Sequence, residues 1–136
     1  MTQQDKSNYF KGLLILIGKD KNISENERRS LSELANILGF DRVFCDNAIS
    51  ELLENEYIIE DPPAFSNPDI ARAFIIDGIK IAFSDHELHI FELNWLKSVA
   101  DKNSLETQWC IDKYNEYQKD PGNADVFEVR KFLKNS

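Results

Sequence analysis

The chain has 136 residues, of which 42% are hydrophobic and 11% aromatic, and this favours one domain with a substantial core. Its formal net charge of -8 disfavours extended contact with nucleic-acid phosphates or anionic membrane surfaces, because both depend on Lys and Arg. Gly and Pro are few, at 5 and 4 residues, which favours helices over a turn-rich β-sandwich.

Residues 1–58 predict three helices. Apolar side chains recur at helical spacing from Ser7 to Gly18. A second helix is predicted at residues 24–38 with Gly39 placed to end it, and Asp41 is placed to cap a third helix that runs to about residue 55. The inward-facing residues predicted for these helices are Tyr9, Phe10, Leu13, Leu14 and Ile17, then Leu31, Leu34, Ala35 and Leu38, then Phe44, Cys45, Ala48, Ile49, Leu52 and Leu53.

The second half of the chain follows a proline-containing stretch at residues 57–68, which we interpret as a connection inside one domain. Asn67 followed by Pro68 predicts a helix start. Helices are predicted at residues 67–82, 84–101, 105–118 and 126–133, with a turn at 120–123 and an inner stripe of Leu88, Phe91, Trp95 and Val99. No segment alternates as a strand does, so we expect an all-α fold with about seven helices.

A short phrase occurs twice in front of these helices. Ser24 and Glu27 match a capping box, in which the serine hydroxyl accepts the backbone N–H three residues on and the glutamate accepts the serine N–H. Ser84 and Glu87 repeat the pattern. Each box follows an apolar helix and precedes two more helices. The sequence therefore predicts an internal duplication, with halves at roughly residues 8–58 and 67–118.

The phrase D-K-N-I-S-E-N-E at residues 20–27, together with N-I-L-G-F-D at 36–41, resembles the TerB-like family associated with tellurite resistance. The family pattern is D-G-x-I-S-x-x-E between an apolar helix and a longer helix that ends in L-G-[LF]; Lys21 replaces the glycine here. The resemblance covers roughly residues 8–118. It implies an all-α bundle of about seven helices with pseudo-twofold repeats, and a role in stress response, protein–protein contacts and metal-ion interaction.

The same resemblance supplies the candidate metal ligands. Asp20 and Glu27 match its acidic positions in the first half and Glu87 matches in the second, where Lys80 stands at the aspartate position. Oxygen ligands suit Ca²⁺ or Mg²⁺. We therefore expect at most a weakly held divalent cation, with helix capping as the alternative role of Ser24 and Glu27.

A second set of metal-ligating residues surrounds the second box: Asp77, Asp85, His86, Glu87 and His89. Two histidines three positions apart with nearby carboxylates suit a transition metal, and solvated side chains near a helix start are the alternative. The two cysteines, Cys45 and Cys110, form no CxxC motif or Cys/His cluster, so we expect buried thiols. Phosphate-binding loops, dinucleotide turns and nucleophile motifs are missing, and we expect neither catalysis nor a cofactor.

Residues 31–58 also resemble a winged helix-turn-helix, with Ala35 and Gly39 at the small-residue positions and Tyr57 and Ile58 starting a wing. A transcriptional regulator or adaptor is therefore the alternative function. DNA reading needs basic and amide side chains, whereas residues 41–61 carry seven acids against Arg42 alone. This disfavours DNA as a partner, and the acidic run is either a solvated face or a docking surface for a basic protein.

Taken together, these features predict a non-catalytic TerB-like module with a protein partner and no nucleic acid or membrane partner. The early apolar run at residues 13–17 is too short for a signal peptide or a membrane span, so we expect a soluble, cytoplasmic protein. Most aromatic residues of the second half should be core, and exposure of Trp109 or Tyr117 would mark an interface there.

Overall fold

The computed structural model describes residues 1–18, 22–54, 61–83, 89–120 and 126–133. Across these residues the chain is all-α, as predicted, with six α-helices, one 3-10 helix and no strand. The elements are α1 (Gln3–Gly18), α2 (Glu25–Ile37), α3 (Arg42–Glu54), α4 (Pro68–Ala82), α5 (Ile90–Lys102), α6 (Thr107–Lys119) and the 3-10 helix η2 (Glu128–Phe132).

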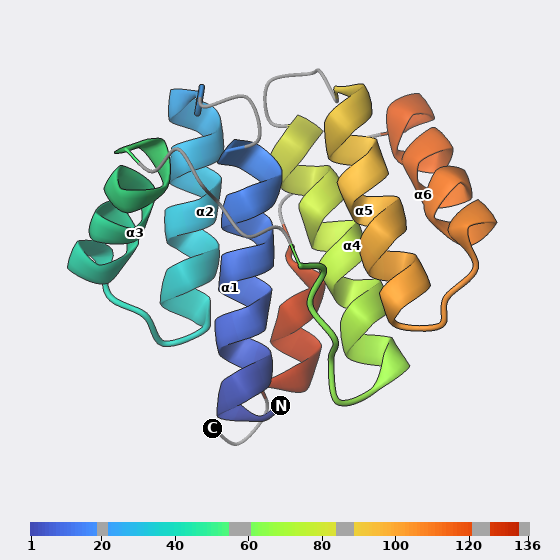
Figure 1. The fold of residues 1–136 in the computed structure, drawn as a ribbon, viewed down its shortest axis with the longest axis horizontal. Helices are drawn as coiled ribbons and strands as arrows, with labels where there is room; N and C mark the ends of the chain where they lie inside the picture. The colour runs from blue at the N-terminus through green and yellow to red at the C-terminus, as the bar shows by residue number, and fades with distance from the viewer. Residues whose placement is uncertain (19–21, 55–60, 84–88, 121–125, 134–136) are drawn as a thin grey trace.

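Helices α1 and α4 lie at the centre of the molecule, with α2 and α3 on the α1 side and α5 and α6 on the α4 side (Figure 1). α1 packs against α2, α3, α4 and α5, whereas α4 packs against α1, α2, α5, α6 and η2. Both central helices contain long apolar runs, and most of their residues are buried. A helix contacted from several directions must be apolar around most of its circumference, which explains why these two sequences occupy the centre.

Local capping interactions begin and end helices where the sequence predicts them. The Ser24 hydroxyl accepts the Glu27 N–H at 3.0 Å, and the Ser24 N–H donates to Glu27 Oε1 at 3.1 Å, so the first capping box is confirmed. Asn67 Oδ1 accepts the Ile70 N–H at 3.0 Å at the start of α4. Gly39 has φ +95°, the left-handed conformation in which helices commonly end.

The start of α5 differs from the prediction. The prediction of one unbroken helix from residue 84 to about 101 is wrong, because α5 begins at Ile90 and His89 has an extended backbone (φ -78°, ψ 153°). The His89 N–H donates to Glu92 Oε1 at 2.9 Å, so this glutamate serves the helix start. Ser84 and Glu87 lie outside the described residues. Two adjacent segments each contain an acid three residues after a candidate capping position, and α5 begins at the later one.

The packing of α4 against α5 and α1 depends on a close approach at Gly78. A Cβ atom at this position would lie 2.9 Å from Leu96 Cδ2 and 3.1 Å from Leu16 Cδ2, distances at which side chains must move. Trp95 crosses from α5 to α1, where its indole N–H donates to the Gly12 carbonyl at 3.1 Å. The close contact and the cross-helix hydrogen bond together position α1, α4 and α5 against one another.

Three residues predicted to face inward are exposed instead. Phe44 is 47% exposed, and Leu53 and Phe91 are each 37% exposed. On α3 the cause is geometric: Val43, Phe44 and Cys45 are consecutive, and successive residues on a helix point about 100° apart. Cys45 is fully buried, which turns the other two toward the surface. The other predicted inward residues that the structure describes are buried or, for Ala48, partly buried.

The helices of the two halves have matching positions along the chain. α1 and α4 begin at residues 3 and 68, α2 and α5 at 25 and 90, and α3 and α6 at 42 and 107, so that each pair is 65 positions apart. The turns match too: the Phe40 N–H donates to the Ala35 carbonyl at 2.9 Å, and the Leu105 N–H donates to the Ala100 carbonyl at 2.8 Å. Ser104, 65 positions after Gly39, also has a positive φ, of 61°.

Candidate functional site

The predicted metal ligands are only partly described by the structure. Asp20 and Glu87 lie outside the described residues. Glu27 is buried at the start of α2, where it accepts the Ser24 N–H as a helix cap. Among the described residues, no group of three or more His, Cys, Asp or Glu side chains is placed to hold a metal ion. The observed role of Glu27 is therefore the capping role that the sequence offered as an alternative.

The second predicted set of metal ligands is also only partly described by the structure. Asp85, His86 and Glu87 lie outside the described residues, whereas His89 stacks on Phe91 with ring centroids 5.2 Å apart. Asp77 is fully buried in α4. Its carboxylate accepts the Tyr9 hydroxyl at 2.7 Å and the backbone N–H groups of Glu128 and Val129 at 2.7 and 3.0 Å.

These contacts make Asp77 the buried connection between α4, α1 and η2. Burial raises its pKa from 3.8 to about 6, although hydrogen bonds from Tyr9 and from the N–H groups of Glu128 and Val129 and the charge of Lys80 act in the opposite direction. Burial, together with the neighbouring Asp77 charge, raises the Tyr9 pKa well above its usual value. A carboxylate that accepts three hydrogen bonds in the core holds the C-terminal segment in place, which is a structural role.

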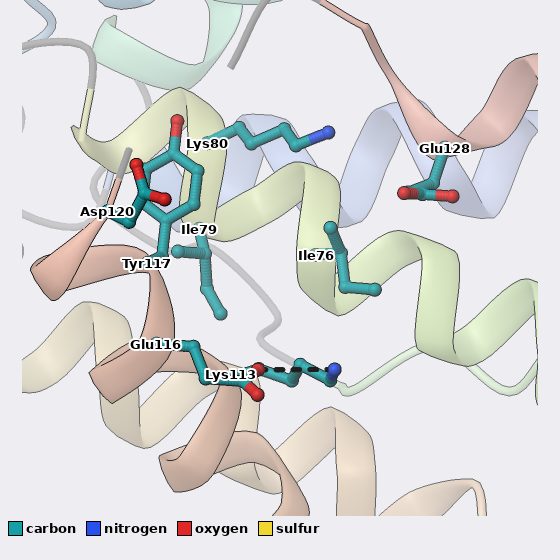
Figure 2. Close-up of a pocket in the computed structure, with 8 residues that line it drawn as sticks. All are labelled: Ile76, Ile79, Lys80, Lys113, Glu116, Tyr117, Asp120 and Glu128. Carbon is teal, nitrogen blue, oxygen red and sulfur yellow. Dashed lines mark ion pairs between the residues drawn. The ribbon is translucent and has the colours of Figure 1, made fainter. Parts of the chain in front are cut away.

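A hollow of about 250 Å³ lies between α4, α6 and η2 (Figure 2). It is lined by Ile76, Ile79, Lys80, Lys113, Glu116, Tyr117, Asp120 and Glu128. Lys113 Nζ is 3.2 Å from Glu116 Oε2, and Lys131 Nζ is 2.5 Å from Glu128 Oε2. The Lys80 ammonium donates to the Val126 carbonyl. Charged groups of this hollow therefore bind one another and attach the C-terminal segment to α4.

A second hollow, of about 240 Å³, lies between α1 and α3 and is apolar. We call it the aromatic groove; it is lined by Ser7, Phe10, Lys11, Leu14, Phe40, Phe44 and Ala48. Three of the lining rings pack against one another, with centroid distances of 5.5 Å for Phe10–Phe44, 5.6 Å for Phe10–Phe40 and 4.9 Å for Phe40–Phe44. Phe44 remains 47% exposed beside Val43, which is 68% exposed. Exposed apolar side chains that adjoin a hollow are typical of an interaction surface.

The side of the aromatic groove formed by α3 is acidic. Residues 25–54 contain seven acids and three arginines. Two of these arginines approach the same carboxylate, since Arg28 lies 3.7 Å and Arg42 3.8 Å from Asp46. Glu51 and Glu54 continue the exposed surface of α3 beyond Ala48. An apolar floor beside an acidic surface can recognise a partner that combines apolar and basic side chains.

The two cysteines are buried and free, which confirms the predicted burial of both thiols. Burial raises the pKa of Cys110 to about 11, and burial likewise raises the pKa of Cys45 despite a contact of 3.6 Å between its sulfur and the Ser32 hydroxyl. A thiol with a raised pKa is a poor nucleophile. Their role in the structure is therefore packing.

Two features were missed from the sequence: the exposure of Phe44 on the surface and the hydrogen-bonded burial of Asp77 in the core. Phe44 was predicted to be core, yet α3 is an outer helix that packs one face against α1 and α2, so the consecutive residues V-F-C cannot all be buried there. Asp77 stands in the apolar run F-I-I-D-G-I-K-I-A. A single acid in such a run indicates a buried hydrogen-bonded carboxylate, although nothing local names Tyr9 as its partner.

No helix in the part of the chain that the structure describes is long and apolar enough to cross a membrane. Comparisons of the chain with protein-family models, with curated proteins and with solved structures found no match.

Proposed function

We propose that this chain is an internally duplicated, TerB-like helical module that acts in stress response without catalysis, by binding another protein. The observation that carries the proposal is the aromatic groove between α1 and α3, where Phe44 and Val43 are exposed beside an apolar hollow. Burial of apolar side chains is the main favourable term in protein association. The cost of keeping these side chains in water would be recovered when a partner covers them.

The duplication draws support from the spacing of the helices. Each helix of the first half begins 65 positions before its counterpart, at residues 3 and 68, 25 and 90, and 42 and 107. The contacts correspond as well, because α1 packs on α5 as α4 packs on α2. Buried residues that match at this spacing are Tyr9 with Phe74, Glu27 with Glu92, Leu31 with Leu96, Ala35 with Ala100 and Cys45 with Cys110. This spacing pairs Ser24 with His89 and replaces the pairing of Ser24 with Ser84.

The character of the two hollows described above supports the non-catalytic part of the proposal. The aromatic groove presents carbon surface, and the hollow beside η2 contains lysines that bind carboxylates or a carbonyl within the chain. Weak binding of a divalent cation at Asp20, Glu27 and Glu87 remains part of the proposal. Titration calorimetry with calcium and zinc on the wild type and on Asp20→Ala tests it, and flat traces from both proteins would remove it.

Crosslinking from inside cells tests the proposed function. A photoreactive amino acid replaces Val43 in one variant and Ile90 in another; both native side chains are 68% exposed, so Ile90 is a matched control. We expect one discrete adduct from position 43 and none from position 90. The additional change Phe44→Asp should abolish the adduct, because it places a charge in the apolar floor. Equal labelling from both positions would contradict the proposal.

A further inference from the structure

The shape of the aromatic groove limits what can occupy it. Its lining runs along two helices, from Ser7 through Leu14 on α1 and from Phe44 to Ala48 on α3. This channel between two helices is lined mainly by apolar side chains, with Ser7 and Lys11 as its polar lining residues. An amphipathic helix fits a channel of this kind, because its side chains at positions i, i+3, i+4 and i+7 form one apolar ridge.

The charges beside the aromatic groove indicate which charge a bound amphipathic helix would carry. Asp41, just before α3, and Glu51 on α3 lie about one turn to either side of the Phe44–Ala48 pair, and Glu54 follows. The chain as a whole has a net charge of -8, and residues 25–54 contain four more acids than bases (seven and three). Complementary charges beside an apolar contact guide the encounter and select the partner.

We propose, on the basis of the function proposed above, that the aromatic groove binds an amphipathic helix of a partner protein whose flank toward α3 carries Lys and Arg. The apolar ridge of that helix covers Phe10, Phe40 and Phe44. Its basic flank lies along the acidic residues of α3. A second copy of this chain is a poor occupant, because two molecules of charge -8 repel each other.

Selection from a library of helical peptides tests this inference. The peptides are about 18 residues long, or five turns, with a fixed apolar ridge and with Lys, Arg, Glu, Asp, Ser or Gln allowed at both flanks. Selection on the purified full chain should enrich Lys and Arg on one flank, and binding of the enriched peptides should weaken as salt increases. Enrichment of acidic or neutral flanks, or of no peptide at all, would overturn the inference.

Variants of the chain then locate the binding surface. Phe44→Ala should weaken the enriched peptides about thirtyfold or more, whereas Phe91→Ala, a similarly exposed ring on α5, should leave their affinity unchanged. If both changes had the same effect, the aromatic groove would not be the site. Circular dichroism of both variants shows that each one is folded.

Charge-reversal variants measure the contribution of the basic flank to affinity separately from that of the apolar ridge. Glu51→Lys combined with Glu54→Lys should weaken binding about tenfold and reduce its salt dependence. Asp101→Lys combined with Glu106→Lys changes the net charge equally on exposed residues of the second half and should have little effect. Equal losses in the two double variants would indicate attraction to overall charge and would overturn the inference.

Two further measurements test the other candidate occupants of the aromatic groove, which are a second copy of the chain and an anionic membrane. Sedimentation of the chain alone should give a monomer; a dimer that Phe44→Ala dissociates would assign the aromatic groove to a second copy and overturn the inference. Vesicles with anionic lipid should not bind. If crosslinking from position 43 captures a partner segment that is neither helical nor basic, the proposed function stands while this inference fails.

Discussion

The helices of the two halves begin at positions 65 residues apart, and the outer surfaces of the two halves differ. Phe44 on α3 and Trp109 on α6 are 65 positions apart, and one turn later Ala48 corresponds to Lys113. Lys113 Nζ lies 5.8 Å above the Trp109 ring and also pairs with Glu116, so the indole is partly covered. Ala48 is too short to cover Phe44. The hollow beside α6 is therefore lined by the charge of Lys113, whereas Ala48 at the corresponding position leaves the aromatic groove apolar.

The centre of the molecule shows a similar contrast. Gly12 on α1 and Asp77 on α4 are also 65 positions apart. A Cβ atom at Gly12 would lie 2.7 Å from the Phe74 ring and 3.2 Å from Pro63, so glycine allows both α4 and the segment that follows α3 to pack closely on α1. Asp77 instead binds the N–H groups of Glu128 and Val129 in the segment that follows α6. Hydrogen bonds attach both trailing segments to the first helix of their half: Ser66 donates to Asp5 on α1, and Glu128 and Val129 donate to Asp77 on α4.

The largest expected effect distinguishes central from outer aromatic residues. Phe74 is fully buried and packs edge-on against Tyr9 at 5.4 Å, so Phe74→Ala should lower the free energy of unfolding by about 3–5 kcal/mol. Phe44→Ala removes the same ring from a half-exposed position and should cost less than about 1 kcal/mol. Urea unfolding of both variants measures the difference, and equal losses would contradict the assignment of Phe44 to the surface.

The buried carboxylate gives the second half its own pH dependence. The Asp77 pKa is about 6 in the folded chain and 3.8 in the unfolded one, so the folded chain binds more protons between about pH 4 and 6. The Asp77 contribution to the free energy of unfolding therefore decreases as pH rises through this window, by at most about 1.4 kcal/mol per pH unit, and stays lower above it. Unfolding between pH 4 and 8 measures this slope, which Asp77→Asn should remove. An unchanged slope would show that Asp77 is not its source.

Asp5 provides an internal contrast with Asp77. Burial alone would raise its pKa, but hydrogen bonds from Ser66 and Thr2 outweigh burial and lower it. Its stabilising contribution is therefore present above about pH 4 and is lost as the pH falls through its folded pKa. Asp5→Asn should thus affect stability at neutral pH without changing the slope that belongs to Asp77.

Exchanging residues at the matching turns sharpens the comparison. Gly39 has φ +95°, so Gly39→Ala should cost about 1–2 kcal/mol, because a side chain is strained in the left-handed region. Ser104 has φ 61°, and Ser104→Gly should therefore raise the stability by less than about 1 kcal/mol. Thermal unfolding monitored by circular dichroism measures both changes. Effects of the same sign would contradict the similarity of the two turns.

A smaller effect is expected at the first capping box. Ser24→Ala removes the hydroxyl that accepts the Glu27 N–H, and it should lower the free energy of unfolding by about 1 kcal/mol. Ser50→Ala changes an exposed serine inside α3 and should be nearly neutral. Denaturant unfolding of the two variants compares them. A neutral Ser24→Ala would mean that the cap observed at this serine does not stabilise α2.

The sequence predicted the parts of the fold that depend on neighbours along the chain. Ser24, Asn67 and Gly39 begin or end helices through contacts with residues a few positions away, so local reasoning found them. It failed at the start of α5, where two candidate capping signals follow one another and the local pattern does not rank them. The aromatic groove was also missed, because its rings come from α1, α3 and the turn between α2 and α3.

The sequence by itself determined that this protein is all-α, where most of its helices lie, and that its charge is strongly negative, since these properties follow from residue spacing, capping chemistry and composition. Only the tertiary structure decided which of Val43, Phe44 and Cys45 faces solvent, and which groups donate hydrogen bonds to the Asp77 carboxylate. The physical reason is that burial and hydrogen bonding in the core join residues far apart in the chain. The Tyr9–Asp77 hydrogen bond joins two central helices, and no local pattern in the sequence encodes that meeting.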